Sequence, residues 1–193
     1  MNCYDFDQTI FFPDSSYCFV MYCLRRWPRA VLRALPGTLV LGVKNLLHLS
    51  DTRALKQQVF SFLRDLDDVD GIVEAFWEEN FERGIAAWYL RNRREDDLIL
   101  SASPEFLLRP AAERLGVRLI ATRMDRHTGE IIGKNCHDHE KVTRFYRDYP
   151  RGHVDCFYSD SFSDSPMVRI ADAAVMVRDR ETLIPWPERG GRP

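Results

Sequence analysis

The sequence predicts an α/β protein: a doubly wound parallel sheet, interrupted by a block of helices. Two patterns predict this class. From residue 97 onward, short apolar runs typical of buried strands alternate with segments of helical periodicity, which is the order that parallel βαβ connections produce. Between residues 15 and 95 the apolar spacing is helical throughout, with no strand pattern. The helical block therefore falls between the first strand and the second.

The first half of the chain predicts one strand and four helices. Residues 2–6 form the short apolar run of a strand, and Pro13 with Asp14 marks the loop that leaves it. The apolar periodicity then predicts helices over 17–33, 38–49, 51–66 (with Ser50 or Asp51 as the cap) and 69–93. We predict two domains, a core of residues 1–14 with 96–193 and a helical domain of residues 15–95.

The second half predicts alternating strands and helices. Gly116 marks the end of the first of these helices, and Thr128-Gly129 the turn of a hairpin over 123–133. Strands are expected at 98–100, 117–122, 154–158 and 173–177, and helices at 104–115, 138–149 and 165–171. The tail from residue 178 is expected to be irregular at its end.

Composition excludes several classes of protein. The chain has 193 residues, 45% of them apolar, which is enough for one good core. Its 27 basic and 29 acidic residues leave a formal charge of -2, so we expect no nucleic-acid partner. Arg33, Pro36, Gly37 and Lys44 interrupt the most apolar stretch, which therefore does not predict a transmembrane helix.

The number and spacing of the cysteines indicate the redox conditions in which the protein is expected to work. Five cysteines are an odd number and show no CxxC spacing, and Asp5 and Asp7 come too early for a secretory signal. We therefore expect a reducing, cytoplasmic location.

Two acids follow the first predicted strand. Asp5 and Asp7 are two residues apart, so their side chains project to the same side of an extended chain. Neighbouring carboxylates repel, and such a pair is stable when a hard cation lies between them or when one is protonated. By itself the pair also fits an ordinary Asx turn.

Three more features fall where later parallel strands end, and thus at one edge of one sheet. Ser101 and Ala102 end a buried strand before a helix start, where backbone N–H groups can cradle phosphate. Lys141 lies on the helix after the hairpin, and Asp160 with Asp164 ends a later strand. Singly, these residues fit a helix cap, a solvated lysine and an acidic turn equally well.

In this order the residues resemble the motifs of the haloacid dehalogenase superfamily, and more narrowly of its phosphoserine-phosphatase-like branch, which has a helical cap inserted after the first motif. The DxDxT motif is Asp5-Phe6-Asp7-Gln8-Thr9, followed by Ser101, Lys141, and Asp160 with Asp164. Gln8 stands where glycine is usual, and Ser161 and Ser163 replace the glycine and asparagine common in that branch's phosphoserine phosphatases.

The resemblance implies a Mg²⁺-dependent phosphatase with a Rossmann-like core. Asp5 would form an aspartyl-phosphate, and Asp7 would act as general acid and base. The remaining assignments by resemblance are Thr9, Ser101, Ala102 and Lys141 as phosphate ligands; Asp5, Asp7 (through its backbone carbonyl) and Asp160 as Mg²⁺ ligands; and Asp164 as a support.

One loop raises a different possibility, a zinc site. Cys136, His137 and His139 lack the spacing that tetrahedral zinc favours. We instead expect Asn135 and Cys136 to line the phosphatase site.

The helical block carries the only information on the substrate. The favoured substrate is the phosphomonoester of a small metabolite. Arginines beside the apolar run of the helical block (Arg25, Arg26, Arg29, Arg33) also fit peripheral contact with an anionic membrane, and a similar cap in phosphatidylglycerophosphate phosphatases makes a lipid head-group phosphate the runner-up. A non-catalytic module that binds phosphate or Mg²⁺ is the alternative from another class.

Overall fold

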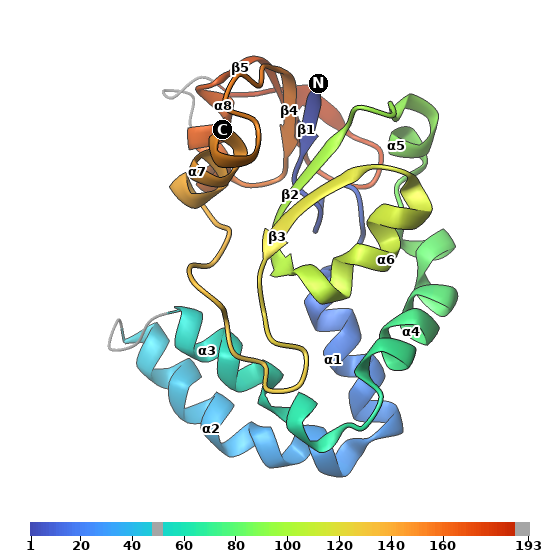
Figure 1. The fold of residues 1–193 in the computed structure, drawn as a ribbon, viewed down its shortest axis with the longest axis vertical. Coiled ribbons are helices and arrows are strands. Elements are labelled where there is room, and N and C mark those ends of the chain that lie inside the picture. The colour runs from blue at the N-terminus through green and yellow to red at the C-terminus, as the bar shows by residue number, and fades with distance from the viewer. Residues whose placement is uncertain (48–51, 188–193) are drawn as a thin grey trace.

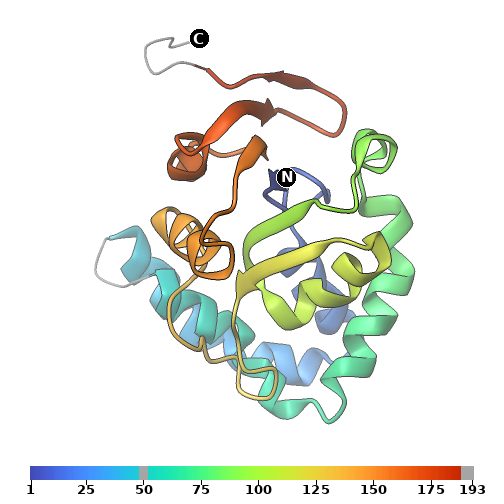
Figure 2. The same cartoon turned by 45° about the horizontal axis from the view of Figure 1, so that its top comes forward.

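A six-stranded sheet forms the centre of the computed structural model, which describes residues 1–47 and 52–187. The strand order is β3-β2-β1-β4-β5-β6, with β3 and β6 at opposite edges (Figures 1 and 2). The strands are β1 (Asn2–Tyr4), β2 (Leu98–Pro104), β3 (Arg118–Thr122), β4 (Val154–Ser159), β5 (Ala171–Val177) and β6 (Leu183–Pro185). The predicted α/β class is confirmed.

The sheet is parallel except at one edge. β6 pairs antiparallel with β5 through Val175–Pro185 and Val177–Leu183. The sequence pattern predicts no strand here, because three residues with a proline carry little strand signal. The end of the tail, which is predicted to be irregular, lies outside the described residues. The sheet is therefore mixed.

Helices cover both faces of the sheet, and alternate strand residues face the two layers. Tyr4 and Ile99 belong to the larger apolar cluster, beneath α1 (Ser15–Arg26), α4 (Val69–Gly84) and α6 (Glu105–Leu115). Cys3 and Leu98 belong to a second cluster beneath α7 (His139–Asp148) and α8 (Ser165–Val168). This is the two-residue period of a strand buried on both faces.

The helical block has different boundaries from those predicted. The expected helix 17–33 is broken at Trp27, since Pro28 begins α2 (Pro28–Leu46), where its missing N–H costs nothing. α2 then continues through Pro36. Next come α3 (Thr52–Val59) and a 3-10 helix (Phe60–Asp65), while the expected caps Ser50 and Asp51 lie outside the described residues.

The expected helix 69–93 is two helices, α4 and α5 (Ala87–Asn92). The break comes from backbone pairing with the loop after β1. Ala86 N–H donates to Ile10 O at 2.8 Å, and Phe12 N–H donates to Gly84 O at 2.9 Å. Tertiary hydrogen bonds of this kind override helical periodicity.

The remaining elements follow the predictions closely. α6 ends at Gly116, whose φ of 68° is the left-handed cap expected of glycine. The predicted hairpin 123–133 is present, with an antiparallel bridge between Met124 and Ile131. Asp125 N–H donates to Glu130 O at 2.8 Å, and Ile132 N–H donates to Arg123 O at 2.9 Å. The predicted helix 165–171 ends at Val168, since β5 already begins at Ala171.

One further property concerns the helices. Over residues 1–47 and 52–187, none of them combines the length and the apolar character needed to cross a membrane.

Gly84 tests the packing of the loop after β1. A Cβ at Gly84 would lie 1.9 Å from Cε2 of Phe11, a fully buried ring stacked on Phe6. Gly84→Ala is expected to lower the free energy of unfolding by about 1–3 kcal/mol through overpacking. Chemical denaturation measures the change.

The matched control is Gly42→Ala in α2, where an added Cβ meets nothing within 4 Å. It is expected to raise stability by up to about 1 kcal/mol through helix propensity. Equal effects of the two substitutions would contradict the packing at Gly84.

Candidate active site

The central strand delivers the first acid of the DxDxT motif to the edge of the sheet. β1 pairs with β2 on one side and β4 on the other, and the chain connections leave in opposite directions there. Asp5 follows β1 directly, and its N–H donates to Tyr158 O at 2.8 Å. Open α/β sheets place their ligands at this switch point.

A cavity of about 450 Å³ opens at this edge. Of the predicted site residues, Asp5, Asp7, Ser101, Ala102 and Asp160 line it. The helical block contributes Ser16 and one wall of the cavity, formed by Thr52, Leu55, Lys56, Val59 and Phe60. Residues far apart in sequence thus form one site between the sheet and α3.

Lys141 lies behind Asp5 rather than on the cavity wall. Its Nζ donates to Asp5 Oδ1 and to Asp164 Oδ2, both at 2.8 Å, and the side chain is 2% exposed. Ser159 Oγ also donates to Asp164 Oδ2, at 2.7 Å. The lysine therefore fixes the carboxylate of Asp5 and links β1 to the loop after β4.

Burial and the neighbouring charges together shift the pKa values of Asp5 and Lys141. Burial raises the pKa of Asp5 to about 7, although Lys141 acts to lower it. Burial disfavours the ammonium of Lys141, but Asp5 and Asp164 outweigh that effect and raise its pKa. The lysine is therefore a permanent positive charge beside Asp5.

Asp7 is held by the start of the helical block and by the end of β2. Ser15 N–H donates to its Oδ1 at 2.6 Å, and Ser103 Oγ donates to its Oδ2 at 2.5 Å. Burial, and then the charge of Asp14, raise the pKa of Asp7 to about 6. Both oxygens are engaged, so the side chain is fixed, and its raised pKa suits proton exchange near neutral pH.

Thr9 has a different contact from the predicted one. The residue is fully buried, and its Oγ1 accepts a hydrogen bond from Asp160 N–H at 3.1 Å. It ties the loop after β1 to the loop after β4. Its role as a phosphate ligand stays a prediction.

The loop at Ser101 differs from the expected helix-start cradle. β2 runs on to Pro104, and α6 begins only at Glu105. Ser103 N–H donates to Ser101 Oγ at 3.0 Å and is therefore not free for an anion. The ladder to β3 shifts register between Ser101 and Pro104, which turns this segment toward the cavity.

Two predictions beside the site are wrong, because Asn135 and Cys136 do not line this cavity. Cys136 is fully buried in the apolar cluster beneath α7, and its N–H donates to Thr122 Oγ1 at 2.9 Å. Asn135 lines a separate hollow with Lys134 and His137. Hydrogen bonds of Thr122 in β3 with Asn135 and Cys136 turn the loop inward.

Sequence reasoning missed Lys56 and Ser103. Half-buried Lys56 reaches from α3 to the end of β2, where Nζ donates to Ala102 O at 2.5 Å. Burial lowers its pKa, against the pull of Asp7 and Asp14. For Lys56 the sequence offers one signal, because the chain has only four lysines and Lys56 is one of them.

Gln8 occupies the position where the family usually has glycine. Its φ of 58° is in the left-handed region, which glycine adopts without strain. The preference for glycine thus has a conformational cause.

The donors around the cavity fit a hard cation such as Mg²⁺. Asp5, Asp7, Asp14 and Asp160 line it together with a single lysine, so its charged groups are mostly carboxylates. Among the described residues, no three Asp, Glu, His or Cys side chains converge into a complete metal site. Mg²⁺ keeps several waters and needs few protein ligands, which agrees with that arrangement.

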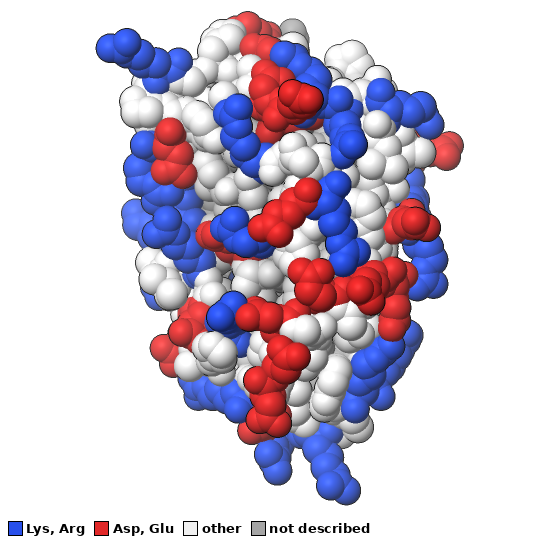
Figure 3. Space-filling model, turned by 45° about the vertical axis from the view of Figure 1, so that its right-hand side comes forward, with Lys and Arg blue, Asp and Glu red and all other residues white. Residues whose placement is uncertain are grey.

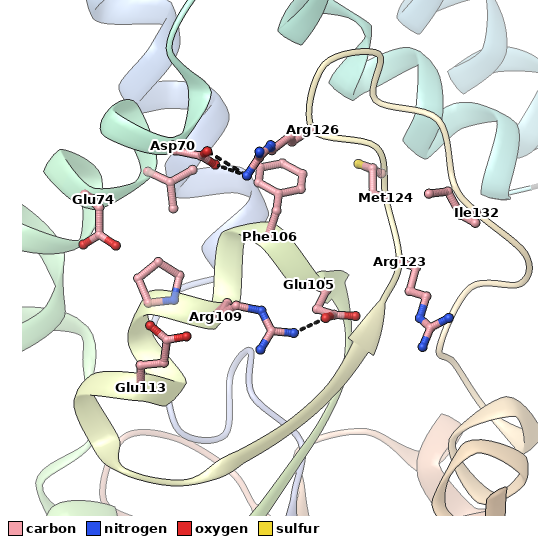
Figure 4. Close-up of a pocket in the computed structure, with 12 residues that line it drawn as sticks. Asp70, Glu74, Glu105, Phe106, Arg109, Glu113, Arg123, Met124, Arg126 and Ile132 are labelled. Carbon is pink, nitrogen blue, oxygen red and sulfur yellow. Dashed lines mark hydrogen bonds and ion pairs between the residues drawn. The ribbon is translucent and has the colours of Figure 1, made fainter. Parts of the chain in front are cut away.

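A larger hollow, of about 550 Å³, lies between α4, α6 and the loop after β3, and none of the predicted site residues lines it. Figure 4 shows Asp70 of α4 meeting Arg126 of that loop, and Arg109 meeting Glu105 on α6. Acidic and basic side chains are interspersed over this face of the molecule (Figure 3). The aspartate-lined cavity, where five of the predicted site residues meet, is therefore the candidate active site.

Residues 3–169 match the family model of haloacid dehalogenase-like hydrolases, so the chain belongs to this family. No curated protein matches the sequence. The fold is similar to a protein of unknown function from Bordetella pertussis Tohama I (TM-score 0.76, 20% identity, covering 91% of this chain and 88% of that one).

Two further solved structures share the fold. A phosphoserine phosphohydrolase-like protein from Francisella tularensis subsp. tularensis SCHU S4 has a TM-score of 0.60 at 14% identity, and the match covers 94% of this chain and 90% of that one. A phospho-aspartyl intermediate analogue of phosphoserine phosphatase has a TM-score of 0.51 at 14% identity, and the match covers 90% of this chain and 84% of that one. The resemblance to the haloacid dehalogenase superfamily is confirmed, and the fold is one that phosphoserine-phosphatase-like proteins share.

Lys141→Met tests the buried ion group. It leaves Asp5 and Asp164 facing each other without a counter-charge, so it is expected to lower the free energy of unfolding by about 3–5 kcal/mol. The double variant Lys141→Met with Asp164→Asn is expected to recover part of that loss. Denaturant titration of both variants and of Asp164→Asn gives the coupling, and strictly additive losses would contradict it.

Proposed function

We propose that the protein is a Mg²⁺-dependent phosphatase that hydrolyses a phosphomonoester through an aspartyl-phosphate at Asp5. The observation that carries this proposal is the position of Asp5. Its Oδ1 is fixed by Lys141, whereas its Oδ2 accepts no hydrogen bond within residues 1–47 and 52–187. One carboxylate oxygen is thus held and the other is free to attack.

The first half-reaction needs a nucleophile and an acid. Asp5 Oδ2 attacks phosphorus, and the bond from phosphorus to the ester oxygen breaks. Asp7 in its protonated form gives its proton to the departing oxygen, and burial favours that form by raising its pKa to about 6. The charge of Lys141 favours the carboxylate of Asp5, and bound Mg²⁺ would favour it further. The product leaves as an alcohol, and the phosphoryl group stays on Asp5.

The second half-reaction reverses the role of Asp7. Its carboxylate takes a proton from water, whose oxygen attacks phosphorus. The bond between phosphorus and Asp5 then breaks, which releases phosphate and restores both acids. Lys141 stabilises the carboxylate of Asp5 as it leaves.

The phosphoryl oxygens need positive charge and donors around them. Lys56 and Ser101 both line the cavity and would supply them. Asp5, the backbone carbonyl of Asp7, and Asp160 would hold Mg²⁺. When bound, the ion neutralises charge on the phosphoryl oxygens and offsets the repulsion between the aspartates.

The favoured substrate is the phosphate ester of a small metabolite, because the cavity is small and mixed in polarity. One observation favours a second candidate, the phosphate of a lipid head group. Leu55, Val59 and Phe60 give the cavity an apolar wall on the side of the helical block. A non-catalytic binder of phosphate or Mg²⁺ would keep the cavity without turnover.

Phosphate release from a panel of small and lipid phosphomonoesters tests the proposal. Turnover is expected with Mg²⁺, with loss to background on chelation, and the ion should restore it. Asp5→Asn is expected to abolish turnover, since an amide is a poor nucleophile. Phosphate binding without turnover on any substrate would favour the non-catalytic alternative.

Lys56 provides a test of the site's geometry. Lys56→Ala removes the cation that faces the cavity, so kcat/KM is expected to fall by about tenfold or more, or at least about 1.4 kcal/mol. Lys134→Ala is the matched control, because that lysine is 82% exposed and lies outside the cavity. Equal values of kcat/KM for the two variants would contradict a role for Lys56 in the site.

A further inference from the structure

Helix α2 presents a large apolar surface to solvent. The structure describes thirteen exposed large apolar side chains, and seven of them lie on α2 or directly after it. We call these seven the α2 apolar face: Leu32, Leu35, Leu39, Val40, Val43, Leu46 and Leu47. Leu39 is 67% exposed and Leu46 is 78% exposed. Single exposed apolar residues are normal, but a contiguous group marks an interaction surface.

The other side of α2 already serves the core. Ala30, Val31 and Ala34 are buried, and Gly37 lies against Gln58 of α3. Figure 1 shows α2 at the lower margin of the molecule, with α3 between it and the sheet. The α2 apolar face is therefore turned away from the core and needs an external partner.

The charges on α2 are of one sign. Arg29, Arg33 and Lys44 are spaced by 4 and 11 residues, so they fall in one line along a border of the apolar face. No acidic residue occurs between positions 28 and 47. Arg33 pairs with Asp65, whereas no ion pair within the described part of the chain involves Arg29 or Lys44.

We propose that the α2 apolar face docks on the surface of an anionic lipid bilayer. An apolar stripe bordered by cations is the pattern of a helix that lies in the membrane interface, with its apolar side among the acyl chains and its cations at the anionic head groups. The charge of the helix is complementary to such a surface.

A second copy of the chain fits this surface less well. Antiparallel two-fold pairing of α2 with itself would bring the basic border of one copy against that of the other, and in a parallel pair the charges along both helices would still all be basic. The helix offers no acid to compensate this repulsion. An anionic bilayer satisfies both the apolar face and the basic border.

Docking through α2 would bring the active site close to the bilayer. α2 packs on α3, and α3 supplies Leu55, Lys56 and Val59 to the cavity wall. The docking proposal itself does not rest on the proposed phosphatase activity, because binding is measured without substrate.

Vesicle flotation of the full chain tests the proposal. Vesicles of phosphatidylcholine mixed with phosphatidylglycerol are expected to carry the protein upward, and vesicles of phosphatidylcholine alone are not. Added salt is expected to weaken the binding, since it screens exposed charges. Equal recovery with both vesicle types, or with neither, would overturn the proposal.

Two variants locate the surface. Leu39→Ser with Val43→Ser, and separately Arg29→Glu with Lys44→Glu, are each expected to lower vesicle affinity at least tenfold. Ile132→Ser with Leu183→Ser is the matched control, since both residues are exposed apolar side chains elsewhere and binding should persist.

Two companion measurements complete the test. Thermal unfolding should be unchanged in all variants, because each altered side chain is exposed. Mass photometry should show the same oligomeric state for the wild type and the α2 variants. Unchanged vesicle binding in the α2 variants, or a dimer that they abolish, would contradict docking to a bilayer.

Discussion

The active site depends on one buried interaction, the contact of Lys141 with Asp5 and Asp164. The ammonium group of Lys141 compensates the charges of two carboxylates, which would repel each other strongly in a buried site. The same contacts join the end of the central strand to the loop after β4. Asp5 is thereby held with one oxygen free. Burial first, and then the charges of Asp164 and Asp7, raise the pKa of Asp5, and a further cation at this point would offset the repulsion among the carboxylates.

The helical block takes part in the site as well as covering it. Ser15 N–H binds Asp7, and Lys56 reaches Ala102 from the opposite side of the cavity. The main apolar cluster also includes residues of both sequence segments, such as Phe6 and Trp77. The division into two domains stays a prediction, and the contacts of the block with Asp7 and Ala102 bring it into the wall of the cavity.

The α/β class and most of the residues that line the cavity at the end of β1 could be predicted from sequence, because strand ends and ordered motifs are local signals. The DxDxT motif and Gly116 required no tertiary knowledge. The break between α4 and α5 could not be predicted, since backbone hydrogen bonds to the distant Ile10 and Phe12 impose it. The inward turn of Cys136 and the reach of Lys56 depend likewise on partners far along the chain.

The proposed mechanism requires that Asp5 carries the phosphoryl group during turnover. Its most direct test is acid quenching of the working enzyme, followed by borohydride reduction, which converts an aspartyl-phosphate to homoserine, and peptide mass spectrometry. Homoserine is expected at position 5 in the wild type and not in Asp5→Asn. Steady phosphate release with position 5 unreduced, or reduction at another aspartate, would contradict it.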